Sequence, residues 1–150
     1  MTALAETVPA NPDYERATRA MFAGQPFMAH IGAELTAVGP GFAEIRLPFR
    51  PAVTQHDGYF HGGVIATLAD NSGGAAGYTV IPAGKALLTV EFKVNILAPG
   101  LGDALIARGR VIRGGRSLVV SSAEVLARHE GQETLCATQL MTLMVVDARS

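Results

Sequence analysis

The sequence predicts an α+β fold in which a helix lies against one curved antiparallel sheet. Three features favour this class. Several segments bounded by Gly and Pro turns have the composition of strands. Three long strands in the second half, each about 10–13 residues, follow one another as a meander. Between the early and the late strands lies a glycine-rich segment, residues 60–78, in a helical register.

An N-terminal helix is expected first, after a loose tail at residues 1–10. Asn11 followed by Pro12 is typical of an N-cap and a first helical residue, and Glu15 suits the positive end of the helix dipole. The helix is expected to end near Gly24. A short turn at residues 27–30 then leads to the first strand.

Six strands are expected, two before the glycine-rich segment and four after it. The turns between them contain Gly-Pro, Gly-Gly and Glu-Gly pairs. In the third strand, apolar residues at the even positions alternate with polar ones, which places Thr89 on the polar face. The expected strands cover residues 33–38, 42–47, 88–96, 103–113, 117–128 and 134–146.

The glycine-rich segment, FHGGVIATLADNSGGAAGY, contains five glycines. Each glycine in a helix interior costs about 1 kcal/mol relative to alanine, so the surroundings must stabilise this helix. Small residues at Ala66, Ala69, Gly73 and Gly77 allow one face to approach a neighbouring backbone closely, as expected if a strongly curved sheet wraps the helix. Alternatively, residues 73–77 form a glycine loop after a shorter helix. Both interpretations make residues 62–71 helical.

Composition limits the classes of function. The 150 residues fit one domain, and 49% hydrophobic against 17% charged residues suggests surface hidden in an oligomer interface. A net charge of -1 gives no reason to expect nucleic acid or an anionic membrane as a partner. The single cysteine, Cys136, excludes an intrachain disulfide. With no signal peptide or apolar run long enough to span a membrane, a cytoplasmic protein is expected.

The start of the glycine-rich helix and Asp70 are the candidate chemical groups. His61-Gly62-Gly63 exposes backbone N–H groups at the positive end of the helix dipole, which suits an oxyanion or a polarised carbonyl. Asp70 follows Gly62 by eight residues, about 12 Å along the helix, so one chain cannot bring both to one carbonyl. Two antiparallel helices across a twofold axis could, which predicts two shared sites at a dimer interface. Alternatively, Asp70 caps a turn at residues 71–73.

His61-Gly62-Gly63, Leu68 and Asp70 resemble the H-G-G-x-x-x-x-L-x-D signature of hotdog-fold acyl-CoA thioesterases, in the phenylacetate-degradation (PaaI-like) branch. The order of elements over residues 21–146 is also similar, including a long strand that ends in Ala-Pro and a hairpin with Gly-Arg-Ser. The resemblance implies a hotdog fold, in which the sheet wraps a central helix. It also implies hydrolysis of an acyl- or arylacyl-CoA to the free acid and coenzyme A.

The resemblance assigns roles to four residues. Asp70 matches the acidic residue that acts as nucleophile or general base, and Gly62 matches the glycine whose N–H polarises the thioester carbonyl. Gln55 stands where the family often has Asn, which helps to place the thioester or the water. Thr89 matches a Ser or Thr that can orient the water in relatives. No metal or redox cofactor is implied, because coenzyme A is part of the substrate.

Basic and histidine side chains are further candidates for substrate binding. Arg113 and Arg116 flank a Gly-Gly turn, where they form either a solvated hairpin tip or a clamp for the phosphates of CoA. His61 and Gly63 are expected to line the site at the start of the helix. His56, Asp57 and His61 lack a recognisable zinc spacing, so no metal site is expected.

The predicted assembly is a homo-oligomer, a dimer with shared sites that pairs with a second dimer to form a tetramer. The acyl or aryl group is expected to lie near Phe60, Val64 and Phe92. Two other functions are compatible with the sequence. A hotdog dehydratase or hydratase would need His61 and Asp70 to converge across the dimer, and a binding protein would hold acyl-CoA without releasing the thiol.

Overall fold

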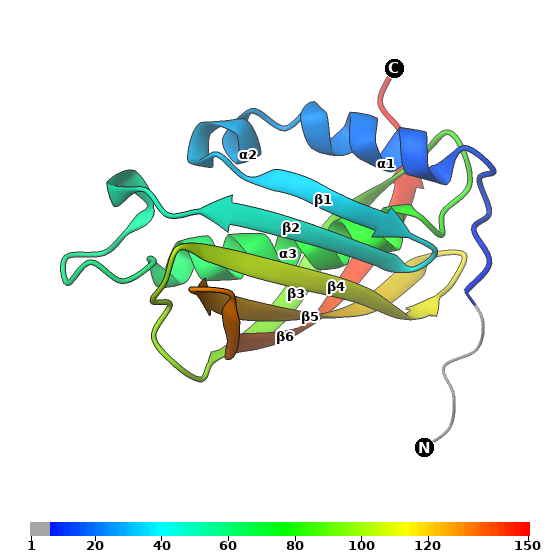
Figure 1. Ribbon diagram of the computed structural model, residues 1–150. Helices are drawn as coiled ribbons and strands as arrows, with labels where there is room; N and C mark the ends of the chain where they lie inside the picture. Colours follow the sequence, from blue (N-terminus) through cyan, green and yellow to red (C-terminus); the bar gives the residue numbers. More distant parts are fainter. Residues whose placement is uncertain (1–6) are drawn as a thin grey trace.

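In the computed structural model, which describes residues 7–150, a six-stranded antiparallel sheet curves around helix α3. The strand order is β1-β2-β4-β5-β6-β3, and α1 and α2 lie along the β1 side of the sheet (Figure 1). The helices are α1 (Tyr14–Ala23), α2 (Pro26–Ile31) and α3 (Gly62–Tyr78), with a 3-10 turn at Pro51–Val53. The strands are β1 (Glu34–Gly39), β2 (Phe42–Pro48), β3 (Lys85–Ile96), β4 (Ala104–Gly114), β5 (Leu118–His129) and β6 (Gln132–Asp147).

Helix α3 is the centre of the fold. It contacts all six strands, and Ile65, Leu68 and Ala69 are buried against the sheet. The helix continues through residues 73–77 to Tyr78, so the predicted helix is confirmed and the alternative of a glycine loop is wrong. Asp70 therefore lies inside a continuous helix, and residues 71–73 form no turn for it to cap. This is the predicted hotdog arrangement.

The small residues of α3 allow the backbones of helix and sheet to meet. A Cβ atom on Gly109 of β4 would lie 2.1 Å from the carbonyl oxygen of Ser72. On Gly73 it would lie 2.2 Å from Sδ of Met141, a flexible side chain that would have to move, whereas the backbone contact at Gly109 requires glycine. Ala66 was expected on the same buried face, but it remains half-exposed on the side of α3 that the sheet leaves open.

The N-terminal elements differ from the prediction in detail. Helix α1 begins at Tyr14, because the side chain of Asn11 accepts a hydrogen bond from the N–H of Asp13 (3.0 Å) in a turn before the helix. The turn expected at residues 27–30 is instead the short helix α2, which starts at Pro26. Of the predicted loose tail, residues 1–6 lie outside the described residues, and residues 7–10 form no helix or strand.

Strand β3 contains a bulge that the sequence pattern does not reveal. Its pairing with β6 shifts register between Thr89 and Glu91, so Thr89 and Phe92 both face α3. The expectation that Thr89 lies on the polar face with Glu91 is therefore wrong. The extra residue, Val90, interrupts the alternation.

Strand β3 also forms one edge of the sheet, and it carries unusual apolar exposure. Leu88 and Val90 are each 56% exposed, and Phe92 is 43% exposed.

Within residues 7–150, no helix has both the length and the apolar character needed to cross a membrane.

Candidate active site

Asp70 lies near the middle of α3, on the side of the helix that faces the edge strand β3. Its side chain is half-buried, and the hydroxyl of Thr89 on β3 donates a hydrogen bond to Asp70 Oδ1 (2.9 Å). Burial raises the pKa of the Asp70 carboxyl, and the hydrogen bond from Thr89 offsets part of that rise. A half-buried carboxylate with a raised pKa and one oriented oxygen is suited to accept a proton or to attack an electrophile.

A pocket of about 300 Å³ adjoins Asp70, between α1, α3 and β3. Met21 and Gln25 come from the end of α1 and the residue before α2, Asn71 and Tyr78 from α3, and Leu87 from β3. Sequence reasoning missed these residues, because Met21 and Gln25 are distant from Asp70 along the chain and share no local pattern with it.

The start of α3 forms a second group of candidate residues. His61 is the N-cap, and its Nδ1 accepts a hydrogen bond from the N–H of Gly63 (2.8 Å). The N–H of Gly63 is thus engaged by the helix cap. No hydrogen bond among residues 7–150 uses the N–H of Gly62, which is a free donor at the positive end of the helix.

Gln55 and Gly62 line one pocket of about 400 Å³, together with Phe60 and Ile96. The side-chain oxygen of Gln55 accepts a hydrogen bond from the N–H of Asp57, which fixes the orientation of the amide. The predicted acyl-binding residue Phe60 therefore belongs to this pocket rather than to the pocket beside Asp70.

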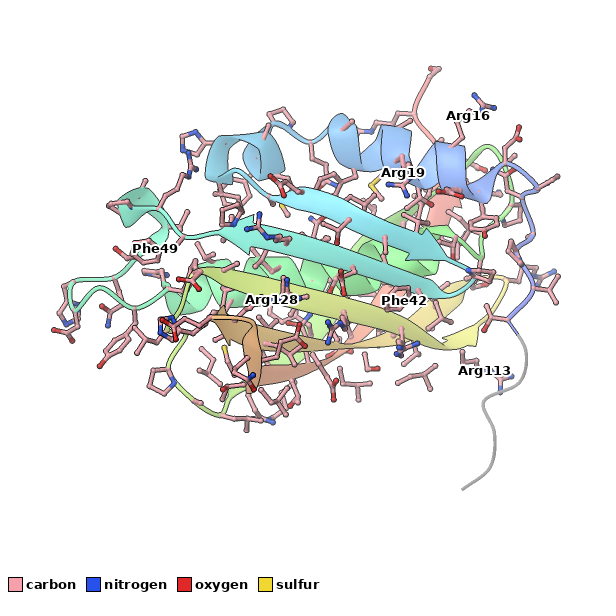
Figure 2. The ribbon with its side chains drawn as sticks, viewed as in Figure 1. Arg16, Arg19, Phe42, Phe49, Arg113 and Arg128 are labelled. Carbon is pink, nitrogen blue, oxygen red and sulfur yellow. The ribbon has the colours of Figure 1, made fainter. Side chains whose placement is uncertain are left out.

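Arg113 and Arg116 lie in a third place. Both side chains are exposed, and they line a groove of about 840 Å³ with Val80 and Thr7. Figure 2 shows Arg113 at the end of the sheet where β4 turns toward β5. This groove begins just beyond the C-terminal end of α3, about two helical turns from Asp70.

The predicted site residues therefore form separate groups in one chain. Asp70 and Thr89 meet at the first pocket, whereas Gln55, His61 and Gly62 meet at the start of α3. Among the residues that the structure describes, no three His, Cys, Asp or Glu side chains are grouped to hold a metal ion.

Comparison with known proteins gives matches along most of the chain. The family model for the Thioesterase superfamily matches residues 57–134. A thioesterase family protein from Silicibacter pomeroyi is 38% identical with a TM-score of 0.88, covering 90% of this chain and 99% of that one. Thioesterase HI1161 from Haemophilus influenzae is 28% identical (TM-score 0.76; 85% and 87% covered). Protein BH2602 from Bacillus halodurans, whose structure contains CoA, is 25% identical (TM-score 0.75; 91% and 89% covered).

Proposed function

Because the chain belongs to the thioesterase superfamily, we propose that it hydrolyses an acyl- or arylacyl-CoA thioester to the free acid and coenzyme A. The observation that carries this proposal is Asp70, whose carboxyl has a raised pKa and a hydrogen bond from Thr89 beside a pocket. Water adds to the acyl carbon, the C–S bond breaks, and the thiolate takes a proton. The reaction needs water and no metal or redox cofactor.

Asp70 acts in its ionised form by one of two routes. As a general base, it takes a proton from water while the water attacks the thioester carbon. As a nucleophile, it attacks that carbon itself, and water then hydrolyses the resulting anhydride. The raised pKa makes the carboxylate a stronger base in both routes. Thr89 holds the side chain in place in either case.

The N–H of Gly62 from the partner subunit polarises the carbonyl in this proposal. Gly62 and Asp70 of one chain are about 12 Å apart along α3, too far to act on one atom. If two α3 helices cross antiparallel on a twofold axis beside Ala66, the midpoint of this interval, each Asp70 comes opposite the other chain's Gly62. The half-exposed Ala66 and the exposed Gly63 leave room for that approach.

Exposed apolar side chains on β3 support the same assembly. Leu88, Val90 and Phe92 lie on an edge strand, where a second copy can cover them. We extend the proposal to a dimer of dimers, since Leu140 and Met144 of β6 are also exposed on the outer face of the sheet.

The remaining predicted residues receive roles in the same proposal. The guanidinium groups of Arg113 and Arg116 bind the phosphates of CoA, for which two exposed cations beside a groove are suited. Gln55 helps to place the thioester or the water, and His61 fixes the start of α3 through its hydrogen bond to Gly63. A cytoplasmic location stays a prediction.

Replacing Asp70 tests the proposal directly. Asp70→Asn keeps the shape of the side chain and replaces the carboxylate, which acts as base or nucleophile, with an amide. We therefore expect kcat to fall at least about a hundredfold across a panel of acyl-CoAs. The measurement is release of the CoA thiol. The matched control is Asp13→Asn, which makes the same change at the exposed N-cap residue of α1 and should retain wild-type kcat.

Folding of the variant is checked by thermal unfolding. Burial raises the pKa of the Asp70 carboxyl, so its ionised form is less favourable in the folded protein than in the unfolded chain. Above the folded pKa, the charge of Asp70 therefore lowers the stability of the folded protein. Asp70→Asn should thus unfold at the same or a higher temperature at pH 7, and this gain should disappear below the ordinary pKa of 3.8. A fully active Asp70→Asn protein contradicts the assignment. Tight acyl-CoA binding without thiol release by the wild type would instead indicate a binding protein, and turnover of enoyl-CoA a hydratase.

A further inference from the structure

Two amide side chains face each other in the wall of the pocket beside Asp70. Gln25 Nε2 donates to Asn71 Oδ1 (3.2 Å), and Asn71 Nδ2 donates to Gln25 Oε1 (2.9 Å). Gln25 Nε2 also lies 3.2 Å from Sδ of Met21. The two amides are half-buried and come from segments 46 residues apart, so the pair exists only in the folded protein.

This pair leaves hydrogen-bonding capacity open toward the pocket. An amide oxygen accepts two hydrogen bonds and an amide nitrogen donates two, whereas each oxygen here accepts one and Asn71 Nδ2 donates one. Met21 and Leu87 supply apolar surface, and no Lys, Arg or His lines the pocket. Apart from the carboxylate of Asp70, the lining is therefore uncharged, polar on one side and apolar on the other.

The size of the pocket limits what it can hold. Its volume is about 300 Å³. An apolar cavity of about 150 Å³ is enough for benzene, so this pocket holds a short acyl chain or one ring with a linker.

We propose that Gln25 and Asn71 determine acyl specificity by selecting compact acyl groups that carry an uncharged hydroxyl substituent over their hydrocarbon analogues. This inference rests on the proposed thioesterase function. A hydroxyl in the pocket forms hydrogen bonds with the open positions of the amides. A hydrocarbon displaces water from these amides and leaves them without a hydrogen-bond partner. Asp70 adds a second restriction, because its negative charge repels an anionic acyl group.

A purely structural role for the pair makes a different prediction. If the amides only attach the N-terminal helices to α3, their loss lowers stability and reduces turnover of all substrates alike. A role in specificity changes the ratio between two substrates. That ratio, measured on one preparation, is independent of the fraction of active protein.

The experiment compares kcat/KM for hexanoyl-CoA, 3-hydroxyhexanoyl-CoA and 6-hydroxyhexanoyl-CoA. For the wild type, we expect at least one hydroxylated substrate to exceed hexanoyl-CoA by about tenfold. Gln25→Leu, similar in volume and without hydrogen-bonding groups, should remove that preference while hexanoyl-CoA is still hydrolysed. Asn71→Leu removes the other amide and should have the same effect. Gln132→Leu, an exposed glutamine at the start of β6, is the matched control and should keep the wild-type ratio.

The outcomes separate this inference from the proposed function. A wild type that hydrolyses hexanoyl-CoA as well as both hydroxylated substrates overturns the inference and leaves the thioesterase in place. So does a ratio that Gln25→Leu and Asn71→Leu leave unchanged. The absence of thiol release from every acyl-CoA overturns the proposed function itself.

Discussion

At the residue scale, burial and a hydrogen bond act in opposite directions on the carboxyl of Asp70. Burial on α3 raises its pKa, because the surroundings solvate the charge less well than water does. The hydroxyl of Thr89 donates to one oxygen and stabilises the ionised form. Thr89 therefore helps to set the pH at which Asp70 becomes active in the reaction that we propose.

Replacing Thr89 should move the acid limb of the pH profile. Activity requires ionised Asp70, so kcat/KM rises with pH through its pKa, above the ordinary value of 3.8. Thr89→Val removes the hydrogen bond that lowers this pKa, and the acid limb should shift to higher pH. Thr89→Ser keeps the hydroxyl and should restore the wild-type profile. An acid limb that is the same in all three proteins would separate Thr89 from the titration of Asp70.

At the element scale, contact between the backbones of β4 and α3 holds the central helix in place. Gly109→Ala would place a Cβ 2.1 Å from the carbonyl oxygen of Ser72, and a backbone atom cannot move aside as a side chain can. We expect a loss of at least about 2 kcal/mol in the free energy of unfolding. Chemical denaturation measures this change.

A second glycine provides the contrasting variant. A Cβ on Gly74 has no atom within 4 Å, although Gly74 neighbours Gly73 in α3. Gly74→Ala should thus stabilise the protein by about 0.5–1 kcal/mol through helix propensity. Equal effects of Gly109→Ala and Gly74→Ala would mean that contact with the sheet does not explain why glycine occupies residue 109.

The elements themselves could largely be predicted from the sequence. Alternation and turn pairs predict the strands within a few residues, and the glycine-rich register predicts α3. The short helix α2 was missed because six residues are too few for a periodic signal. Gly109 follows the rule that glycine within a strand often marks close approach of another backbone.

At the scale of the whole molecule, the proposed shared site predicts complementation between two inactive chains. Gly62→Pro removes the free N–H at the first residue of α3, where proline is tolerated, and His61 already has an extended backbone (φ -62°, ψ 136°). Gly62→Pro and Asp70→Asn should each be inactive alone. A mixed dimer should contain one intact site, so a random mixture regains about a quarter of wild-type activity per chain.

Controls for this experiment follow from the twofold geometry. The two variants must be coexpressed, or unfolded and refolded together, so that chains exchange. The double variant, with both changes in one chain, should form mixed dimers with wild type that contain no intact site, because each shared site then takes one altered residue from the double variant. If the coexpressed single variants remain inactive while native mass spectrometry shows mixed dimers, Asp70 and Gly62 do not share a site across the interface.

The candidate site was less predictable from sequence than the fold. The family resemblance placed Asp70 and Thr89 in the site with separate roles, and the hydrogen bond between their side chains is a finding of the structure. The pocket beside them was not, because Met21 and Gln25 reach Asp70 only through the packing of α1 on the rest of the fold. Local periodicity carries no information about such contacts.

The bulge at Val90 divides β3 into two segments, and the alternation of side chains between the two faces of the sheet starts again after it. Leu87 and Thr89 before it line the pocket beside Asp70, whereas Ile96 after it lines the pocket at the start of α3. Deletion of Val90 would join the two segments in one continuous register with β6 and leave each on the face that it now presents. The extra residue is thus a position where the length of β3 can change while the linings of both pockets stay on the same face of the sheet.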